Sequence, residues 1–340
     1  MNSRERVEAA LRLEEPDRVP YCELGVDRAL AAKLLGWEET DQAADLEKNT
    51  YTLEEAKAIA ARLKLDNICY VLRAPVYAEK LPGQDGRLFY GEGLIRTEKD
   101  LARLEFPDPY DDALYEEAEF FAACKGEYSL WFVTRLGIFP TMLSMGMENF
   151  SIALYENRSF VEQVLDAYCS WIEVVAERIC QLDFDVFVST DDMAFKSSPF
   201  FSREVFCELV LPRYKRIASK ITIPWVLHSD GNISPFVDDL LDLGIAGLHP
   251  NEKGAMDIRA MKQKYGDRLC LLGNVDLNLL GMGTPAEVDR EVRDLIRDLA
   301  PGGGYIVTSG NSLAGYLLPE NVLALAEAVQ KYGLYPIQLD

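Results

Sequence analysis

The stretch Trp225-Val226-Leu227-His228-Ser229-Asp230-Gly231-Asn232 decides the fold, because an apolar run breaks abruptly there into polar residues. Residues 225–227 have the composition of a buried strand, so the polar residues that follow would lie at its carboxyl end. His228 and Asp230 are two positions apart, a spacing that puts both side chains on one side of an extended backbone, and Gly231 allows a sharp turn after them. Since α/β folds carry their chemistry at the carboxyl ends of strands, we expect the functional site to begin here.

Apolar runs of strand length recur along the chain, and helical patterns separate them. Such an alternation requires parallel pairing with right-handed crossovers. Polar residues follow most of the runs, as in a barrel, and no Gly-x-Gly-x-x-Gly follows the first run, which argues against a dinucleotide-binding sheet. We therefore predict one α/β domain over residues 1–340, a (β/α)8 TIM barrel with an N-terminal helical extension at 4–13. The predicted strands are 19–24, 67–72, 129–134, 186–190, 225–227, 247–249, 269–272 and 305–308.

Two local patterns refine this prediction. Ser202 is a candidate helix cap, and Thr284 with Glu287 forms a capping-box pattern before a second helix. Residues 82–86 contain a turn signal, which we place in an insertion between the first barrel units.

The composition excludes several classes of partner. With 56 acidic and 35 basic residues the formal charge is −21, so the surface repels nucleic acid and anionic lipid. The charged start of the chain lacks a signal-peptide pattern, and no run of 18 apolar residues occurs, which predicts a cytoplasmic protein. Seven scattered cysteines without a Cys-x-x-Cys pair are typical of a reducing compartment. No nucleophile elbow, Walker loop or His-Glu-x-x-His is present.

Further candidate site residues follow other predicted strands, and each also has a purely structural interpretation. Asp191 and Asp192 follow the run at 186–190, so at least one carboxylate should face the cavity, unless it caps a helix. Glu252 is a candidate ligand or base, against the alternative of a solvated loop carboxylate. Asn274 and Asp276 are again two positions apart after a strand, although both could bind backbone groups instead.

Arg135 follows the run at 129–134 and is a candidate for binding substrate. Met142, Met145 and Phe150 lie nearby in the sequence and could line an apolar pocket, although such a stripe is more often ordinary core.

Taken together, these residues resemble the uroporphyrinogen decarboxylase superfamily, whose fold is a (β/α)8 barrel. The resemblance extends over nearly the whole chain. The matching stretches are Arg4-Glu5-Arg6-Val7 through Pro16-Asp17-Arg18-Val19-Pro20, His228-Ser229-Asp230-Gly231, Leu272-Gly273-Asn274-Val275-Asp276, Gly283-Thr284-Pro285-Ala286-Glu287-Val288, Gly303-Gly304-Tyr305-Ile306 and Pro319-Glu320-Asn321.

The resemblance points to one of the two main activities of that superfamily. Porphyrinogen decarboxylases carry an Arg-x-x-Gly-Arg-Tyr signature near the N-terminus, whereas this chain has Tyr21-Cys22-Glu23-Leu24-Gly25, which argues against an anionic tetrapyrrole. Cobamide-dependent methyltransferases hold zinc with His-x-Cys and a distant Cys. His228 matches that His, Asp230 occupies the first Cys position, and Asn311 most plausibly replaces the second.

These replacements define the expected chemistry. Oxygen ligands make a harder, more Lewis-acidic site than thiolates, which disfavours a thiol acceptor such as coenzyme M and favours a methyl donor with an ether oxygen. The resemblance thus implies a methyltransferase that moves a methyl group from a small O-methyl compound, such as a methoxylated aromatic, to cobalamin carried by a separate corrinoid protein.

Roles follow for the candidate residues. His228 and Asp230, with Glu252, would hold zinc or serve as acid, and Asp191 joins them as a catalytic candidate. The residues that would bind and orient substrate are Arg135, Asp192, Asn274, Asp276 and Asn311.

Two other functions and the oligomeric state stay open. The runner-up function is a metal-free decarboxylase in which an Asp such as Asp191 stabilises the intermediate. A third interpretation is a barrel retained as a binding module. The sequence is compatible with a homodimer and does not decide the oligomeric state.

Overall fold

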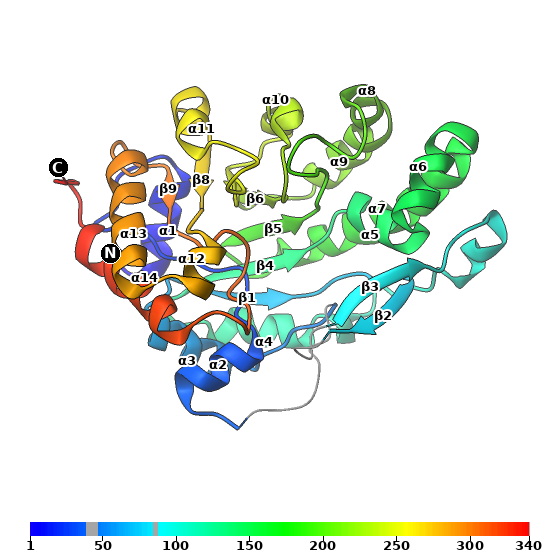
Figure 1. The fold of residues 1–340 in the computed structure, drawn as a ribbon. Helices are drawn as coiled ribbons and strands as arrows, with labels where there is room; N and C mark the ends of the chain where they lie inside the picture. The colour runs from blue at the N-terminus through cyan, green and yellow to red at the C-terminus, as the bar shows by residue number, and fades with distance from the viewer. Residues whose placement is uncertain (39–46, 84–87, 340) are drawn as a thin grey trace.

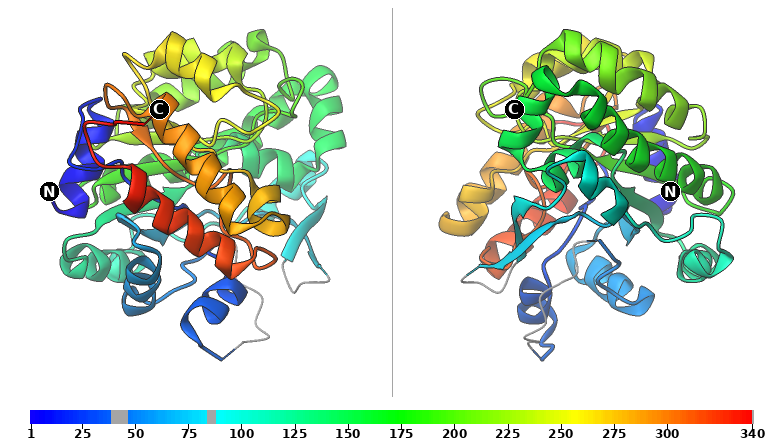
Figure 2. Two further views of the ribbon diagram at one scale, coloured as in Figure 1. Left: turned by 60° about the vertical axis from the view of Figure 1, so that its left-hand side comes forward. Right: turned by 90° about the vertical axis from the view of Figure 1, so that its right-hand side faces the viewer.

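Seven parallel strands form one curled sheet in the computed structural model, which describes residues 1–38, 47–83 and 88–339 (Figure 1). Each strand pairs with the next one along the chain, apart from a separate hairpin inserted after the first. Together with the helices on its outside, the sheet makes a TIM-barrel-like α/β fold (Figure 2). The strands of the sheet are β1 (Asn67–Val71), β4 (Ser129–Thr134), β5 (Val186–Thr190), β6 (Trp225–His228), β7 (Gly247–His249), β8 (Cys270–Leu272) and β9 (Tyr305–Ile306).

The first expected strand, 19–24, is an irregular segment rather than a strand. Tyr21 forms a parallel bridge with Val307, next to β9, and its carbonyl accepts the N–H of Asp66, just before β1. The segment therefore lies between the two edge strands of the curled sheet. Pro20 lacks a backbone N–H, which removes one donor from a regular ladder.

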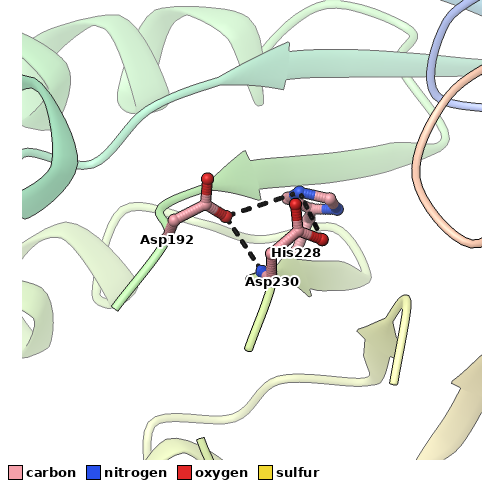
Figure 3. Close-up of side chains that lie close together, drawn as sticks. All are labelled: Asp192, His228 and Asp230. Atoms are coloured by element: carbon pink, nitrogen blue, oxygen red, sulfur yellow. Dashed lines mark hydrogen bonds and ion pairs between the residues drawn. The ribbon is translucent and has the colours of Figure 1, made fainter. Parts of the chain in front are cut away.

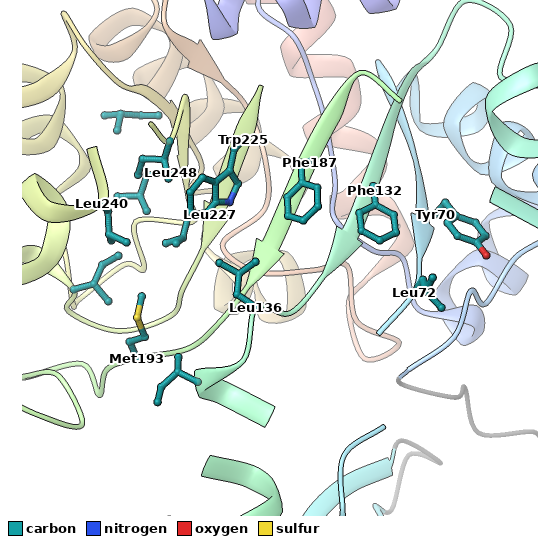
Figure 4. Close-up of a cluster of buried hydrophobic side chains, with 14 of the residues drawn as sticks. Tyr70, Leu72, Phe132, Leu136, Phe187, Met193, Trp225, Leu227, Leu240 and Leu248 are labelled. Atoms are coloured by element: carbon teal, nitrogen blue, oxygen red, sulfur yellow. The ribbon is translucent and has the colours of Figure 1, made fainter. Parts of the chain in front are cut away.

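Both faces of the sheet are buried, which explains why its strands are continuous apolar runs. In β4, Trp131 and Val133 belong to the core inside the curled sheet, whereas Leu130 and Phe132 belong to the core between the sheet and the helices. Figure 4 shows part of this outer core, with aromatic side chains on successive strands. The side-chain alternation of each strand thus supplies two cores at once.

Helix α1 (Ser3–Leu11) covers the amino end of the curled sheet. It begins with a capping box in which Asn2 and Glu5 bind each other's backbone N–H groups. Its residues Val7 and Leu11 pack into the inner core with the strand side chains. The helix predicted at 4–13 is present but ends two residues earlier, at Leu11, and it closes the end opposite to the polar strand ends.

The predicted caps of the later helices are also present. Ser202 accepts the N–H of Val205, and Thr284 forms a capping box with Glu287. The other α-helices are α2 (Arg28–Leu35), α3 (Leu53–Leu63), α4 (Glu116–Cys124), α5 (Ile138–Met145), α6 (Met147–Glu156), α7 (Arg158–Ile179), α8 (Arg203–Val205), α9 (Leu211–Ala218), α10 (Val237–Asp242), α11 (Ile258–Tyr265), α12 (Leu277–Met282), α13 (Pro285–Leu299) and α14 (Pro319–Tyr332).

The insertion after β1 is an antiparallel hairpin of β2 (Ala78–Pro82) and β3 (Leu88–Gly93). Most of the turn predicted at 82–86 falls outside the described residues, apart from Pro82 and Gly83. The remaining short elements are the 3-10 turns Glu98–Arg103, Asp112–Leu114 and Ser234–Phe236 and the π turn Phe206–Val210. Among the described residues, no helix has the length and apolar character needed to cross a membrane.

Candidate functional site

The carboxyl ends of β5, β6 and β7 bring polar side chains from three strands together. Thr190, His228 and His249 are the last residues of these strands and are aligned in register. Asp192 comes two residues after Thr190, and Asp230 two residues after His228. The arrangement follows from parallel pairing, since equivalent ends of neighbouring strands lie at one edge.

Asp192, His228 and Asp230 form a compact group at this edge (Figure 3). His228 Nε2 lies 3.6 Å from Asp192 Oδ1 and 3.9 Å from Asp230 Oδ1. The Asp230 N–H donates to Asp192 Oδ1 at 2.9 Å. On the other side, Asn311 Nδ2 donates to Asp230 Oδ2 at 2.6 Å. Two predicted site residues, His228 and Asp230, therefore meet a third, Asp192, and Asn311 holds one of the carboxylates.

This group fits a metal cation. One ligand atom from each of the three residues lies within 4.8 Å of the others. Asp230 Oδ1 is buried and accepts no hydrogen bond, so its lone pairs are available to a cation bound by the group. Burial raises the pKa of Asp230 to about 6 despite the attraction of His228, and the nearby Asp192 and Glu252 carboxylates add to the rise. One imidazole and two carboxylates are ligands that zinc accepts, leaving a position open for another molecule.

His249 packs its ring against that of His228. The Nδ1 atoms of the two rings are 2.6 Å apart and buried, so one ring donates a proton to the other. Burial keeps the pKa of His249 well below its usual value, with repulsion from His228 as a second cause. A neutral His249 can accept the proton of His228 Nδ1, which leaves the lone pair of His228 Nε2 facing the two carboxylates.

A cavity of about 320 Å³ opens beside the group, with His228 and Asp192 in its wall. Arg135, predicted as a substrate-binding residue, and Asn311 also line it. The whole lining is Leu24, Gly25, Lys48, Thr50, Val71, Arg73, Val133, Arg135, Phe139, Thr190, Asp192, His228, Asn311 and Ser312. The cavity therefore combines cationic, apolar and metal-ligand-type side chains, as small-molecule sites do.

Asp191 is completely buried and turned away from this cavity. Its carboxylate accepts the backbone N–H groups of Leu136, Gly137 and Phe139 at 2.6, 3.2 and 3.3 Å. Burial raises its pKa, and these hydrogen bonds oppose the rise. Asp191 thus fixes the loop between β4 and α5, which carries Arg135. Its predicted catalytic role stays a prediction, and its observed contacts are those of a positioning residue.

Glu252 lies close to the group without belonging to it. Its Oε2 accepts the N–H of Gly231 at 2.8 Å, and its Oε1 pairs with Lys196 at 3.2 Å. Gly231 has a φ of +81°, and a Cβ there would lie 2.3 Å from the carbonyl oxygen of Ala194. Glu252 therefore stabilises the turn that glycine allows after Asp230, and its predicted role as a ligand stays a prediction.

Asn274 and Asp276 lie away from the cavity at His228. Asn274 lines a different cavity of about 810 Å³ and donates from Nδ2 to the carbonyl of Asn251 at 2.6 Å. Asp276 caps α12 by accepting the N–H of Asn278. These contacts match the structural interpretation that the sequence also allowed for both residues.

Three residues around the cavity were missed by the sequence reasoning. Arg73 follows β1 and Lys48 lies before α3, and both line the cavity. Tyr90, on the inserted hairpin, accepts a hydrogen bond from Arg135 Nη1 at 3.3 Å. Arg73 could have been found by the rule used for Arg135, since it also follows an apolar strand. No local signal marks Lys48 or Tyr90.

Comparisons with known proteins found relatives with two kinds of named activity. Over 171 residues the chain is 26% identical to the methylcobamide:CoM methyltransferase MtaA of Methanosarcina barkeri, which is 50% of this chain and 49% of that protein. Over 78 residues it is 30% identical to the uroporphyrinogen decarboxylase of Pseudoalteromonas translucida, covering 23% of this chain and 22% of that one. The chain thus spans about half the length of the first relative and less of the second.

The fold is also that of a solved relative. A methyltransferase from Methanosarcina mazei superposes with a TM-score of 0.77 and 21% identity, covering 98% of this chain and 99% of that one, which shows a shared fold. The family model described as uroporphyrinogen decarboxylase (URO-D) matches residues 2–332. The chain therefore belongs to the uroporphyrinogen decarboxylase family.

Proposed function

We propose that this protein is a methyltransferase that moves a methyl group from a small O-methyl compound to the corrinoid of a separate protein. The observation that carries the proposal is the group of Asp192, His228 and Asp230, in which Asp230 Oδ1 is buried and unsatisfied, beside a small cavity that Asp192 and His228 line. Relatives named as methyltransferases and a methyltransferase of the same fold support the reaction class.

The donor set favours an ether substrate over a thiol. The three side chains offer one nitrogen and two oxygens, and the described residues supply no thiolate to this group. Such a set suits a harder, more Lewis-acidic cation than a thiolate-rich one does. Zinc bound by Asp192, His228 and Asp230 would supply electrophilic stabilisation at the ether oxygen.

The residues around this group have supporting roles. With the shared proton on His228 Nδ1, His249 would accept it and His228 Nε2 would be the ligand atom. Asn311 orients Asp230 through the hydrogen bond to Oδ2, leaving Oδ1 directed at the group. In the reaction the bond between the methyl carbon and the oxygen breaks, the electron pair stays on the oxygen, and the methyl group passes to the reduced corrinoid. A corrinoid that comes from outside requires access to the cavity mouth.

The test measures methyl transfer from a panel of methoxylated aromatics, with free cob(I)alamin and then a reduced corrinoid protein as acceptor. We expect the visible spectrum of the corrinoid to change to that of the methylated form. Asp230→Asn should slow this change by more than about tenfold, because a neutral amide replaces an anionic carboxylate ligand. Asp238→Asn, at an exposed carboxylate on α10, is the matched control and should react normally.

Two outcomes would contradict the proposal. Release of carbon dioxide from a carboxylated substrate, with no spectral change across the panel, would favour the decarboxylase. Tight ligand binding without any turnover would favour a binding module.

A further inference from the structure

Two arginines face the cavity from neighbouring strands. Arg73 follows β1 and Arg135 follows β4, and β1 and β4 are paired in parallel. Lys48 adds a third cationic side chain to the same lining. The molecule as a whole is strongly acidic, so a cavity whose lining has three cations against the one carboxylate of Asp192 is a local reversal of charge.

Each guanidinium is held in place by neighbours. The Arg135 guanidinium carbon lies 5.5 Å from the ring centre of Tyr90 and 5.6 Å from that of Phe139. Arg135 Nε is buried and makes no hydrogen bond among the described residues. Arg73 Nη2 donates to Thr190 Oγ1 at 3.3 Å. Arg135 is therefore oriented by aromatic rings, and Arg73 is tied to the end of β5, beside His228.

The two arginines repel each other. Burial lowers the pKa of Arg73 to about 9, and the charge of Arg135 is the second cause. Attraction to Tyr90, Asp191 and Asp192 opposes this drop in the pKa of Arg73 without cancelling it. An anion between the guanidiniums would relieve this repulsion.

We propose that Arg135 and Arg73 bind a carboxylate of the substrate, so that the methyl donor is a small methoxylated aromatic acid. Planar guanidiniums match the two oxygens of a carboxylate, which makes a carboxylate the preferred anion for such a pair. Val71, Val133 and Phe139 form an apolar wall for the ring. The part of this inference that concerns methyl transfer rests on the proposed function. The part that concerns carboxylate binding rests on the arginines alone.

The spacing of the strands supports the same substrate. Arg135 follows β4 and His228 ends β6, with β5 between them, so their backbones are roughly 10 Å apart at a strand spacing of about 4.8 Å. Both side chains reach into the cavity and shorten that span. A single ring with its carboxylate at one side and its methoxy group at the other bridges it.

Binding measured by calorimetry tests the carboxylate site without any turnover. The probes are 4-methoxybenzoate, benzoate and the neutral methoxybenzene. We expect both acids to bind wild-type protein at least about tenfold more tightly than methoxybenzene, because only the acids can form charge-assisted hydrogen bonds with the guanidiniums. Arg135→Gln and Arg73→Gln should each weaken benzoate binding about tenfold or more. Arg216→Gln, on the surface of α9, is the control and should bind normally.

The outcomes separate this inference from the proposed function. Arginine-dependent binding of benzoate without methyl transfer from 4-methoxybenzoate would uphold the carboxylate site and reject the methyltransferase. Methyl transfer from methoxybenzene and 4-methoxybenzoate alike, with equal affinities, would uphold the methyltransferase and overturn the carboxylate site. Equal affinity of wild-type protein for the neutral and acidic probes overturns it in any case, even if an arginine variant fails to fold.

Discussion

Glu23 is the buried residue with the clearest electrostatic consequence. It lies in the segment between β9 and β1, where its Oε1 accepts the Ser309 N–H at 2.9 Å and its Oε2 accepts the Ser309 Oγ–H at 2.6 Å. Burial raises the pKa of Glu23 to about 8, although both hydrogen bonds to Ser309 oppose the rise. The carboxyl is therefore protonated near neutral pH, and the folded protein binds a proton that the unfolded chain releases.

This difference predicts that stability falls as the pH rises. The folded-state pKa lies above the usual value of 4.5, so the contribution is complete below about pH 4.5 and is lost as the pH passes through about 8. Thermal unfolding from about pH 6 to about pH 9 should show a larger drop in the melting temperature for wild type than for Glu23→Gln, which cannot ionise. Equal drops in the two proteins would show that Glu23 titrates normally.

At the scale of elements, helix α1 packs its apolar side chains against the inner core. Leu11 packs with strand side chains such as Val226 and Leu272, and a Cβ at Gly247 would lie 3.4 Å from Leu11 Cδ2. The inner core is thus completed by a helix that precedes every strand in the sequence. Its packing stabilises the end of the sheet that lies away from the site.

Leu11→Ala should therefore destabilise the protein by about 2–5 kcal/mol, because it leaves a cavity that a barrel interior cannot close. Chemical denaturation measures this loss. Leu334→Ala is the matched control, since that leucine is 63% exposed and its truncation should change the unfolding free energy little. A loss equally small in both variants would mean that α1 does not seal the inner core.

At the scale of the whole molecule, the site lies at one end of two extensive apolar cores that do not depend on it. The inner and outer cores involve all seven strands, whereas the metal-ligand-type group uses only the ends of β5 and β6. A fold of this size buries enough apolar surface to be stable without a metal.

If the group binds zinc as proposed, loss of that zinc should leave the fold intact. His228→Ala is expected to abolish bound zinc, measured by elemental analysis, while the far-UV circular dichroism stays that of wild type. Treatment of wild-type protein with a chelator should give the same result, and Asp238→Asn should retain its zinc. A chelated protein that loses its helical signal would show that the metal holds the fold together.

The sequence by itself determined the seven strands of the curled sheet, although it wrongly predicted an eighth at 19–24, and it marked the edge at which the candidate site lies. Runs such as 129–134 and 186–190 are apolar without interruption because both faces of a parallel sheet are buried, and the structure confirms both as strands. The polar residues after them mark the carboxyl ends. His228 and Asp230 could therefore be predicted as site candidates from one short stretch.

Only the tertiary structure decided which side chains meet. Asp191 and Asp192 are adjacent in sequence, and the direction in which each points depends on contacts with the loop after β4 and with Asp230. Arg73 reaches the cavity because β1 pairs with β4, a relation between residues more than sixty positions apart. Local sequence patterns determine secondary structure, but they contain no information on such distant pairings. Which residues line the cavity is therefore decided only by the tertiary structure.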